Sequence, residues 1–193
     1  QVGWEADDLI ATATRKLTDL GEDVIIVTGD RDSYQLVSDP HVRVLYNKRG
    51  VSDYALYDEA GIEEKTGVTP AMYVQYAALR GDTSDNLPGV PGVGEKTAAK
   101  LINKYGGLDG IFAHVDEQTP KLKSSLIENE ARARKNLDLM MLHFDAPLTV
   151  EIDGVDVDVD FIDRSAPTGL GSSPDPDEMK RLFEFLEFRA LGS

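Results

Sequence analysis

The sequence predicts an α/β fold in which a sheet of mainly parallel strands with flanking helices is followed by a helical region that contains a helix-hairpin-helix motif. Three observations support this fold class. Residues 6–20 carry apolar side chains at helical spacing and end at Gly21. Residues 24–27 are a short, β-branched apolar run, which is typical of a buried strand. From residue 70 onward the apolar spacing is mainly helical.

Two further strands are predicted between the first strand and the helical region. Residues 42–46 and 51–56 are rich in β-branched and aromatic side chains, and they flank the polar run Asn47-Lys48-Arg49-Gly50. A β-hairpin with its turn at residues 47–50 is therefore expected.

The helical region begins at Pro70, a residue that favours the first turn of a helix. Helices are predicted over residues 70–79, 95–105 and 122–142, the last one interrupted near Asn129.

The chain is expected to divide into three regions. Residues 1–80 would form the α/β core and residues 81–145 the helix-hairpin-helix region. Residues 146–193 would hold an acidic edge strand near residues 155–161, a linker rich in Pro, Gly and Ser at 165–177, and a closing amphipathic helix.

Composition narrows the class of protein and of site. The chain has 193 residues, and no apolar run is long enough for a membrane span, so membrane insertion is not expected. It contains no cysteine, and its three histidines show no metal-ligand spacing, so any metal must be held by oxygen atoms. The absence of cysteine fits a cytoplasmic location. The first residue is Gln1, which suggests a fragment or a processed piece of a longer protein.

The formal net charge of −15, taken alone, argues against a nucleic-acid partner. The charge is unevenly distributed, however. Between Glu95 and Lys135 there are eight Lys or Arg against six Asp or Glu, so this window is basic while the remainder is acidic. One segment could therefore bind phosphates even though the chain as a whole is acidic.

Acidic side chains gather in three short groups. These are Glu5 with Asp7 and Asp8, Asp30 with Asp32, and Asp82 with Asp85. In extended chain Asp30 and Asp32 point to the same side, beyond the end of a strand where α/β sheets place their ligands. Asp82 and Asp85 are one helical turn apart, so both can face one point.

Each acidic group taken alone has a simpler structural explanation. Acids at a helix N-terminus complement the helix dipole, and aspartates in loops commonly cap turns. Taken together, with no histidine or thiol nearby, they match what a hard divalent cation such as Mg²⁺ requires. Two such ions would activate a water for attack on phosphorus and stabilise the charge on the leaving oxygen.

The glycine-rich run from Leu87 to Gly94, followed by Glu95-Lys96-Thr97, is the most specific local pattern. It is not a nucleotide-binding P-loop, because Glu95 separates Gly94 from Lys96 and the preceding residues are helical. A helix-hairpin-helix fits better, since its glycines let the backbone approach a DNA phosphate closely. The candidate DNA-binding residues here are Gly89, Gly92, Val93, Gly94, Lys96, Thr97, Lys100 and Lys104.

Three of these residues, Lys96, Lys100 and Lys104, repeat every four positions, opposite a predicted buried stripe. A solvated helix face is the alternative for the lysines considered alone. Beside the hairpin, a phosphate track is favoured.

With these patterns in order, the chain resembles the 5′ nuclease domain of bacterial DNA polymerase I, within the flap endonuclease family. The resemblance rests on four blocks, at residues 3–8, 28–32, 81–90 and 92–98, and on the closing run at residues 182–188. It implies that Glu5, Asp7, Asp30, Asp32 and Asp85 are catalytic metal ligands, with Asp8 and Asp82 assisting directly or through water.

The resemblance also implies two Mg²⁺ or Mn²⁺ ions, a potassium ion on the hairpin carbonyls, and a polymerase domain on the same natural chain. The expected substrates are 5′-flap or nicked duplex DNA and RNA primer–DNA hybrids, bound by a monomer in the cytoplasm, at the bacterial nucleoid. Family members also carry an upstream strand with further metal-binding aspartates and a basic helical arch, which are not among these 193 residues.

Two other functions remain open on the sequence. One is a DNA-binding module without catalysis, which would use only the hairpin and its lysines. The other is a metal-dependent phosphatase that acts on small molecules, as suggested by the acids beyond a strand end.

Overall fold

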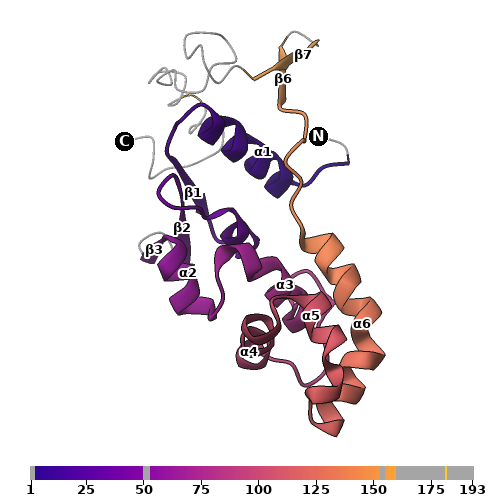
Figure 1. Ribbon diagram of the computed structural model, residues 1–193. Coiled ribbons are helices and arrows are strands. Elements are labelled where there is room, and N and C mark those ends of the chain that lie inside the picture. The colour runs from indigo at the N-terminus through magenta and orange to yellow at the C-terminus, as the bar shows by residue number, and fades with distance from the viewer. Residues whose placement is uncertain (1–2, 50–52, 153–154, 160–180, 182–193) are drawn as a thin grey trace. The chain divides into compact units, whose positions relative to one another are not determined.

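The computed structural model describes residues 3–49, 53–152, 155–159 and 181, and it divides into two compact units, Gln1–Ala146 and Pro147–Ser193 (Figure 1). The elements of the first unit are α1 (Ala6–Asp19), β1 (Val24–Thr28), the 3-10 helix η1 (Asp32–Leu36), β2 (Val42–Arg49), β3 (Asp53–Tyr57), α2 (Glu59–Thr66), α3 (Pro70–Arg80), β4 (Gly81–Asp82), β5 (Leu87–Pro88), α4 (Glu95–Tyr105), α5 (Leu108–Ala113), the 3-10 helix η2 (Val115–Glu117) and α6 (Pro120–Met140). Both regions predicted before residue 145 belong to this unit, and a boundary between them at residue 80 stays a prediction.

The main sheet of the first unit has the order β1-β2-β3. Strands β1 and β2 are parallel, with Val24 opposite Val42, whereas β2 and β3 are antiparallel. The sheet is therefore mixed, and the expectation of mainly parallel strands is not confirmed for the described residues. The predicted hairpin is present, but β2 continues to Arg49, so residues 47–49 extend the strand and do not form the turn. The connection itself, residues 50–52, is outside the described part of the chain.

Only one face of this sheet is covered by the core. Ile26, Val42 and Val44 are buried on that face. On the opposite face Ile25 and Val27 of β1 are 58% and 65% exposed, and Leu56 of β3 is 51% exposed. The prediction of a fully buried first strand was wrong, because the described residues cover the sheet on one side only.

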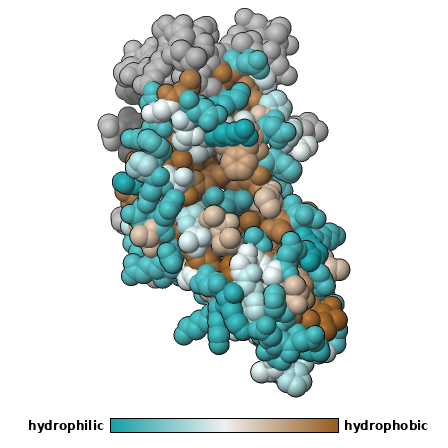
Figure 2. Space-filling view, in the orientation of Figure 1, coloured by the Kyte–Doolittle hydropathy of each residue, from teal (hydrophilic) through white to brown (hydrophobic). Residues whose placement is uncertain are grey.

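Helix α3 is the centre of the helical region and packs against α4, α6 and η1. It is buried along most of its length, including the aromatic side chains of Tyr73 and Tyr76. Helix α6 runs without the predicted break, because the Asn129 amide donates to the Ser125 carbonyl one turn earlier, at 2.8 Å, and so stays compatible with the helix. On the face of the molecule seen in Figure 2, hydrophobic residues gather mainly near the middle, and hydrophilic residues cover most of the helical part.

Strands β4 and β5 form a short antiparallel pair at the end of α3. Gly81 and Gly89 approach each other so closely that a Cβ atom on either would overlap the backbone of the other strand. Gly81 also has a φ of 80°, which side-chain-bearing residues rarely adopt. The side-chain amide of Asn136 on α6 donates to the carbonyls of Ala78, at 3.2 Å, and Pro88, at 3.0 Å. These contacts fix the loop between β4 and β5 to α3 and α6.

The segment that follows α6 is fastened to α1. The backbone N–H of His143 donates to Asp8 Oδ1 at 2.9 Å, and that of Ala146 donates to the Thr12 hydroxyl at 3.0 Å. Trp4 packs edge-on against the His143 ring, with ring centroids 6.0 Å apart. The start of α1, where the first acidic group lies, is therefore held in place by the end of the first unit.

In the second unit, β6 (Thr149–Ile152) pairs antiparallel with β7 (Val155–Asp158), which confirms a strand in the acidic segment. The predicted linker at residues 165–177 and the closing helix lie outside the described residues. No helix in the described part of the chain is long and apolar enough to cross a membrane.

Candidate active site

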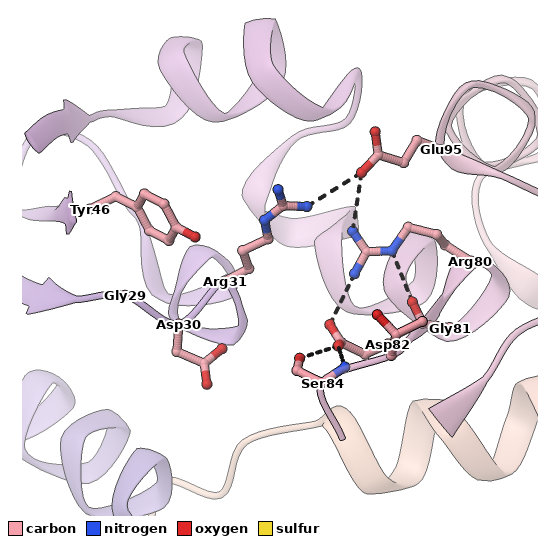
Figure 3. Close-up of a pocket in the computed structure, with 10 residues that line it drawn as sticks. Gly29, Asp30, Arg31, Tyr46, Arg80, Gly81, Asp82, Ser84 and Glu95 are labelled. Atoms are coloured by element: carbon pink, nitrogen blue, oxygen red, sulfur yellow. Dashed lines mark hydrogen bonds and ion pairs between the residues drawn. The ribbon is translucent and has the colours of Figure 1, made fainter. Parts of the chain in front are cut away.

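A cavity of about 560 Å³ opens where the end of β1 meets the end of α3 (Figure 3). Its lining residues are Gly29, Asp30, Arg31, Tyr46, Arg80, Gly81, Asp82, Thr83, Ser84 and Glu95. Two of the predicted acidic groups thus contribute to one cavity. The residues come from the strand end, the β4–β5 loop and the first turn of α4, which are distant in sequence.

Asp30 and Asp32 are positioned by a tight turn that follows β1. The Thr28 hydroxyl accepts a hydrogen bond from the Asp30 N–H at 2.9 Å, and Asp30 Oδ1 accepts one from the Asp32 N–H, also at 2.9 Å. Asp30 is exposed, whereas Asp32 begins η1 and is half-buried. The turn therefore presents one carboxylate to solvent and draws the other toward the protein interior.

Asp82 is held more tightly than Asp85. Its Oδ1 accepts hydrogen bonds from the Ser84 N–H, at 2.8 Å, and from the Ser84 hydroxyl, and its Oδ2 faces Arg80 at 3.2 Å. Burial alone would raise the pKa of Asp82, but the Ser84 hydrogen bonds and the Arg80 charge together hold it below its usual value. Asp85 is exposed near the far end of the same loop. Asp82 thus organises the loop, and Asp85 is the freer of the two carboxylates.

The first acidic group lies at the start of α1. Glu5 is the N-cap residue and is exposed, and its backbone N–H donates to Asp8 Oδ2 at 3.2 Å. Since Asp8 Oδ1 accepts the His143 N–H, both oxygens of Asp8 are used by the backbone, and the residue is only 8% exposed. Asp7 is half-buried. Asp8 therefore has a structural role, and a ligand role for Glu5 and Asp7 stays a prediction.

Electrostatics link the three acidic groups. Burial, and then the charge of Asp30, raise the pKa of Asp7, with a smaller contribution from Asp85. Burial, and then the charges of Asp30, Asp82, Asp85 and Asp7, together raise the pKa of Asp32 to about 7. Burial and the charges of Asp82 and Asp30 raise the pKa of Asp85. Carboxylates from α1, the β1 end and the β4–β5 loop therefore repel one another across a shared region.

The donor set fits a hard divalent cation, because it consists of carboxylate oxygens. Burial first, and then neighbouring carboxylate charges, raise the pKa of Asp7, Asp32 and Asp85, and a bound cation would offset both effects. Among the described residues, however, no three His, Cys, Asp or Glu side chains lie close enough together to hold a metal ion. The structure brings the predicted acids within electrostatic range of one another. Their direct contact with shared ions stays a prediction.

The predicted DNA-binding residues lie in the segment between β5 and α4 and on α4 itself, and the helix-hairpin-helix motif stays a prediction. Gly92 and Gly94 face open space, as a close approach to phosphate requires, whereas the space around Gly89 is filled by Arg80 and Gly81. Val93 is 4% exposed and its N–H donates to the Val90 carbonyl at 3.0 Å. Gly89 and Val93 therefore have roles inside the fold that their sequence pattern did not indicate.

The lysine stripe is on the surface as predicted. Lys96, Lys100 and Lys104 are exposed, while Ala98 and Ile102 on the same helix are buried. Lys104 is paired with Glu117 at 2.9 Å, so it is less available to a ligand than the Lys100 position one turn earlier.

Among the lining residues that the sequence did not indicate, four have charged or aromatic side chains: Arg31, Arg80, Glu95 and Tyr46. Arg31 stands between two predicted ligands and Arg80 directly precedes the Gly81-Asp82 pair. These positions were a usable signal, because a cation next to grouped acids in a loop can serve the same site. The pairing of both arginines with Glu95 depends on tertiary structure and left no local pattern.

Two family models match the chain in succession. Residues 1–67 match the 5′-3′ exonuclease N-terminal resolvase-like domain, and residues 68–161 match the 5′-3′ exonuclease C-terminal SAM fold. DNA polymerase I of Mycobacterium bovis is 45% identical over 190 residues, which are 98% of this chain and 19% of that protein. A 5′-3′ exonuclease of Streptomyces coelicolor is 56% identical over 121 residues, which are 62% of this chain and 39% of that protein. The chain thus spans about a fifth of the length of its DNA polymerase I relative.

Solved structures agree with these matches. A zinc-bound T5 5′-exonuclease structure has a TM-score of 0.64 and 25% identity, and covers 72% of this chain and 50% of its own. The catalytic core of Rad2 in complex with DNA has a TM-score of 0.52 at 18% identity, covers 91% of this chain and 54% of its own, and shows likeness of fold. The two family models match consecutive parts of the chain and together cover residues 1–161, so the chain belongs to the 5′-3′ exonuclease family.

Proposed function

We propose that the protein is a structure-selective 5′ nuclease that hydrolyses phosphodiesters at 5′ ends and flaps of DNA and in RNA primers. The observation that supports this most directly is the electrostatic coupling of Asp7, Asp32 and Asp85, which come from three separate segments of the chain. Membership of the 5′-3′ exonuclease family supports a role for this acidic region in phosphodiester hydrolysis. The natural protein would carry a polymerase domain on the same chain, since its relatives include DNA polymerase I. It would act as a monomer on cytoplasmic DNA.

Five carboxylates are proposed to hold two divalent ions, Mg²⁺ or Mn²⁺: Glu5, Asp7, Asp30, Asp32 and Asp85. When bound, such ions supply an activated water and stabilise the charge that develops on the phosphoryl and leaving oxygens. Asp8 and Asp82 would assist indirectly. Asp8 fixes the first turn of α1 through two backbone N–H groups, and Asp82 shapes the loop that presents Asp85.

The hairpin between β5 and α4 is proposed to grip duplex DNA as a helix-hairpin-helix. The open space at Gly92 and Gly94 would admit a phosphate, and the carbonyls of the same turn would bind a potassium ion. Lys96, Thr97, Lys100 and Lys104 would continue the contact along α4. Such contacts hold the backbone without reading base sequence.

A second candidate is a DNA-binding module without catalysis. One observation favours it, namely that the described residues hold no group of three side chains close enough for a metal ion. In that case the hairpin and lysines would bind duplex DNA while the acidic region served only folding. A phosphatase for small molecules is the third candidate, and the experiment below separates all three.

The test is cleavage of a 5′-labelled flap duplex, followed with Mg²⁺ and with chelator. The wild-type protein should cut only with Mg²⁺, and Asp30→Ala should lower the rate by at least about a hundredfold, since a lost charge-stabilising ligand costs that much or more. Asp138→Ala, an exposed aspartate on α6, is the matched control and should cut at the wild-type rate. Binding without cleavage would favour the module, and hydrolysis of small phosphate esters with flap DNA ignored would favour the phosphatase.

A further inference from the structure

Two arginines from separate elements converge on one carboxylate in the cavity (Figure 3). Arg31 follows β1 and Arg80 ends α3, and each places a terminal guanidinium nitrogen near Glu95 Oε1, at 3.3 Å and 3.6 Å. All three side chains line the cavity together with Asp30 and Asp82. Two guanidinium groups are thus directed at one position, which the Glu95 carboxylate occupies.

The Arg80 side chain is fixed more rigidly than the Glu95 side chain. The Arg80 side chain is 12% exposed, and it is fixed by hydrogen bonds from Nε to the Gly81 carbonyl and from Nη2 to Asp82. Glu95 is 63% exposed and lies at the first position of α4. Since exposed ion pairs contribute little and a long exposed side chain has many rotamers, Glu95 can leave while Arg80 stays in place.

Paired guanidinium groups are the side chains best suited to bind a phosphodiester, because their planar donors match phosphate oxygens. The cavity also contains the carboxylates of Asp30 and Asp82, which repel an incoming phosphate. A phosphate could therefore settle there only if cationic donors faced it. Glu95 stands where the phosphate would be, and it neutralises those donors in the free protein.

We propose that Arg31 and Arg80 bind a phosphodiester of the DNA substrate in this cavity, and that Glu95 occupies their donors until the phosphate displaces it. This inference rests on the proposed function. It makes the arginines positioning residues, which hold the substrate backbone beside Asp30, and it makes Glu95 an internal competitor that lowers the affinity for DNA. Removing the Glu95 charge should consequently strengthen binding.

The test measures binding of a fluorescent 5′-flap duplex by anisotropy, with chelator present so that no cleavage occurs. Glu95→Gln should lower Kd about threefold to tenfold, in line with one additional phosphate contact. Arg31→Gln should raise Kd and reduce the slope of log Kd against log salt by about 1, which a merely structural defect would not do. Arg31→Lys keeps the charge and should recover most of the slope. In the double variant Glu95→Gln/Arg31→Gln, the gain from Glu95→Gln should shrink.

Glu130→Gln is the matched control, because it removes an equal charge from a half-exposed ion pair with Arg134 on α6, outside the cavity. Its Kd should stay within about twofold of wild type, as expected when a distant rim charge is lost. An unchanged or weaker Kd in Glu95→Gln, or an equal gain in Glu130→Gln, would overturn the inference while leaving the proposed function intact. Failure of the wild-type protein to bind flap DNA at all would instead overturn the proposed function, and this inference with it.

Discussion

Asp32 is an acid whose surroundings oppose its charge. Burial and four neighbouring carboxylates raise its pKa to about 7, from a usual value of 3.8. An acid with a raised pKa binds its proton more tightly in the folded protein than in the unfolded chain. Ionisation of Asp32 therefore lowers the stability of the folded protein when no cation is bound. A metal ligand is expected to behave in this way, because the bound cation would offset the unfavourable charge.

The contribution of Asp32 to the unfolding free energy of the metal-free protein should therefore fall as the pH rises from about 4 to about 7, because the unfolded chain ionises Asp32 first. The slope from this one group is at most about 1.4 kcal/mol per pH unit. Asp32→Asn keeps the shape of the side chain and should remove this contribution. Urea unfolding at pH 5 and pH 7 measures it, with Asp138→Asn on α6 as the control. Equal slopes in wild type and Asp32→Asn would contradict the assignment.

Tyr34 combines a well-packed aromatic ring with a buried hydroxyl group that makes no hydrogen bond to the described residues. The ring is fully buried and packs edge-on against Tyr46, Tyr57 and Tyr73. Its hydroxyl has no hydrogen-bond partner among the described residues. A buried polar group without a partner costs free energy, so the ring alone stabilises this part of the core.

Tyr34→Phe should therefore leave the unfolding free energy unchanged or raise it by up to about 1 kcal/mol. Tyr34→Ala should lower it by about 3–5 kcal/mol, because the aromatic cluster would lose its central ring. Chemical denaturation of both variants provides the comparison. A loss of more than about 1 kcal/mol in Tyr34→Phe would mean that the hydroxyl is satisfied by an ordered water.

Among the elements, α4 presents two distinct faces. Ala98 and Ile102 are buried against the helical region, and Lys96, Lys100 and Lys104 face solvent. Since Lys104 is already paired with Glu117, Lys100 is the residue on which to test the stripe.

Lys100→Ala should weaken binding to flap DNA to the same extent for unrelated base sequences, and should reduce the salt slope by about 1. A phosphate contact has this signature because it senses charge and not bases. Lys135→Ala, an exposed lysine on α6, is the control and should leave the slope unchanged. A loss of affinity that depended on DNA sequence would count against a phosphate contact at Lys100.

The elements also show what local sequence can and cannot predict. Helices α1, α3 and α4 were predictable because their ends are marked by residues such as Gly21, Pro70 and Gly106, whose backbone preferences act locally. The continuity of α6 was not, since Asn129 breaks helices in some contexts and bonds to the preceding turn in this one. The half-exposed state of β1 depends on what covers the sheet, which no spacing within the strand reveals.

At the scale of the whole molecule, the described residues leave one face of the main sheet open. Ile25 and Val27 on β1, with Leu56 on β3, make that face apolar. Exposed apolar surface of this kind binds hydrophobic dyes and promotes association.

The protein should therefore enhance the fluorescence of a dye specific for apolar surfaces, and Ile25→Thr/Val27→Thr should lower that signal by more than half. Threonine keeps the preference for strand, so the fold should persist, which circular dichroism can verify. Leu139→Thr, which alters an exposed leucine on α6, should have a much smaller effect. An undiminished signal in the double variant would place the apolar surface elsewhere.

The site itself was predictable only in parts. The two members of each acidic pair could be recognised from their spacing, because a turn or a single helical step fixes neighbours. That Asp7, Asp32 and Asp85 influence one another across three segments could be inferred only by resemblance to a family, since such distances follow from tertiary packing. The link from Arg31 through Glu95 to Arg80 was missed for the same reason.

The contact between Gly81 and Gly89 has a mechanical consequence. Because backbone meets backbone there with no side chain between, the acidic loop and the hairpin tip cannot shift independently. If Gly92 contacts DNA as proposed, a displacement there would be passed through this backbone contact to the turn that holds Asp82 and Asp85. In the proposed function, DNA binding at the turn before α4 and the orientation of the carboxylates would therefore be mechanically coupled.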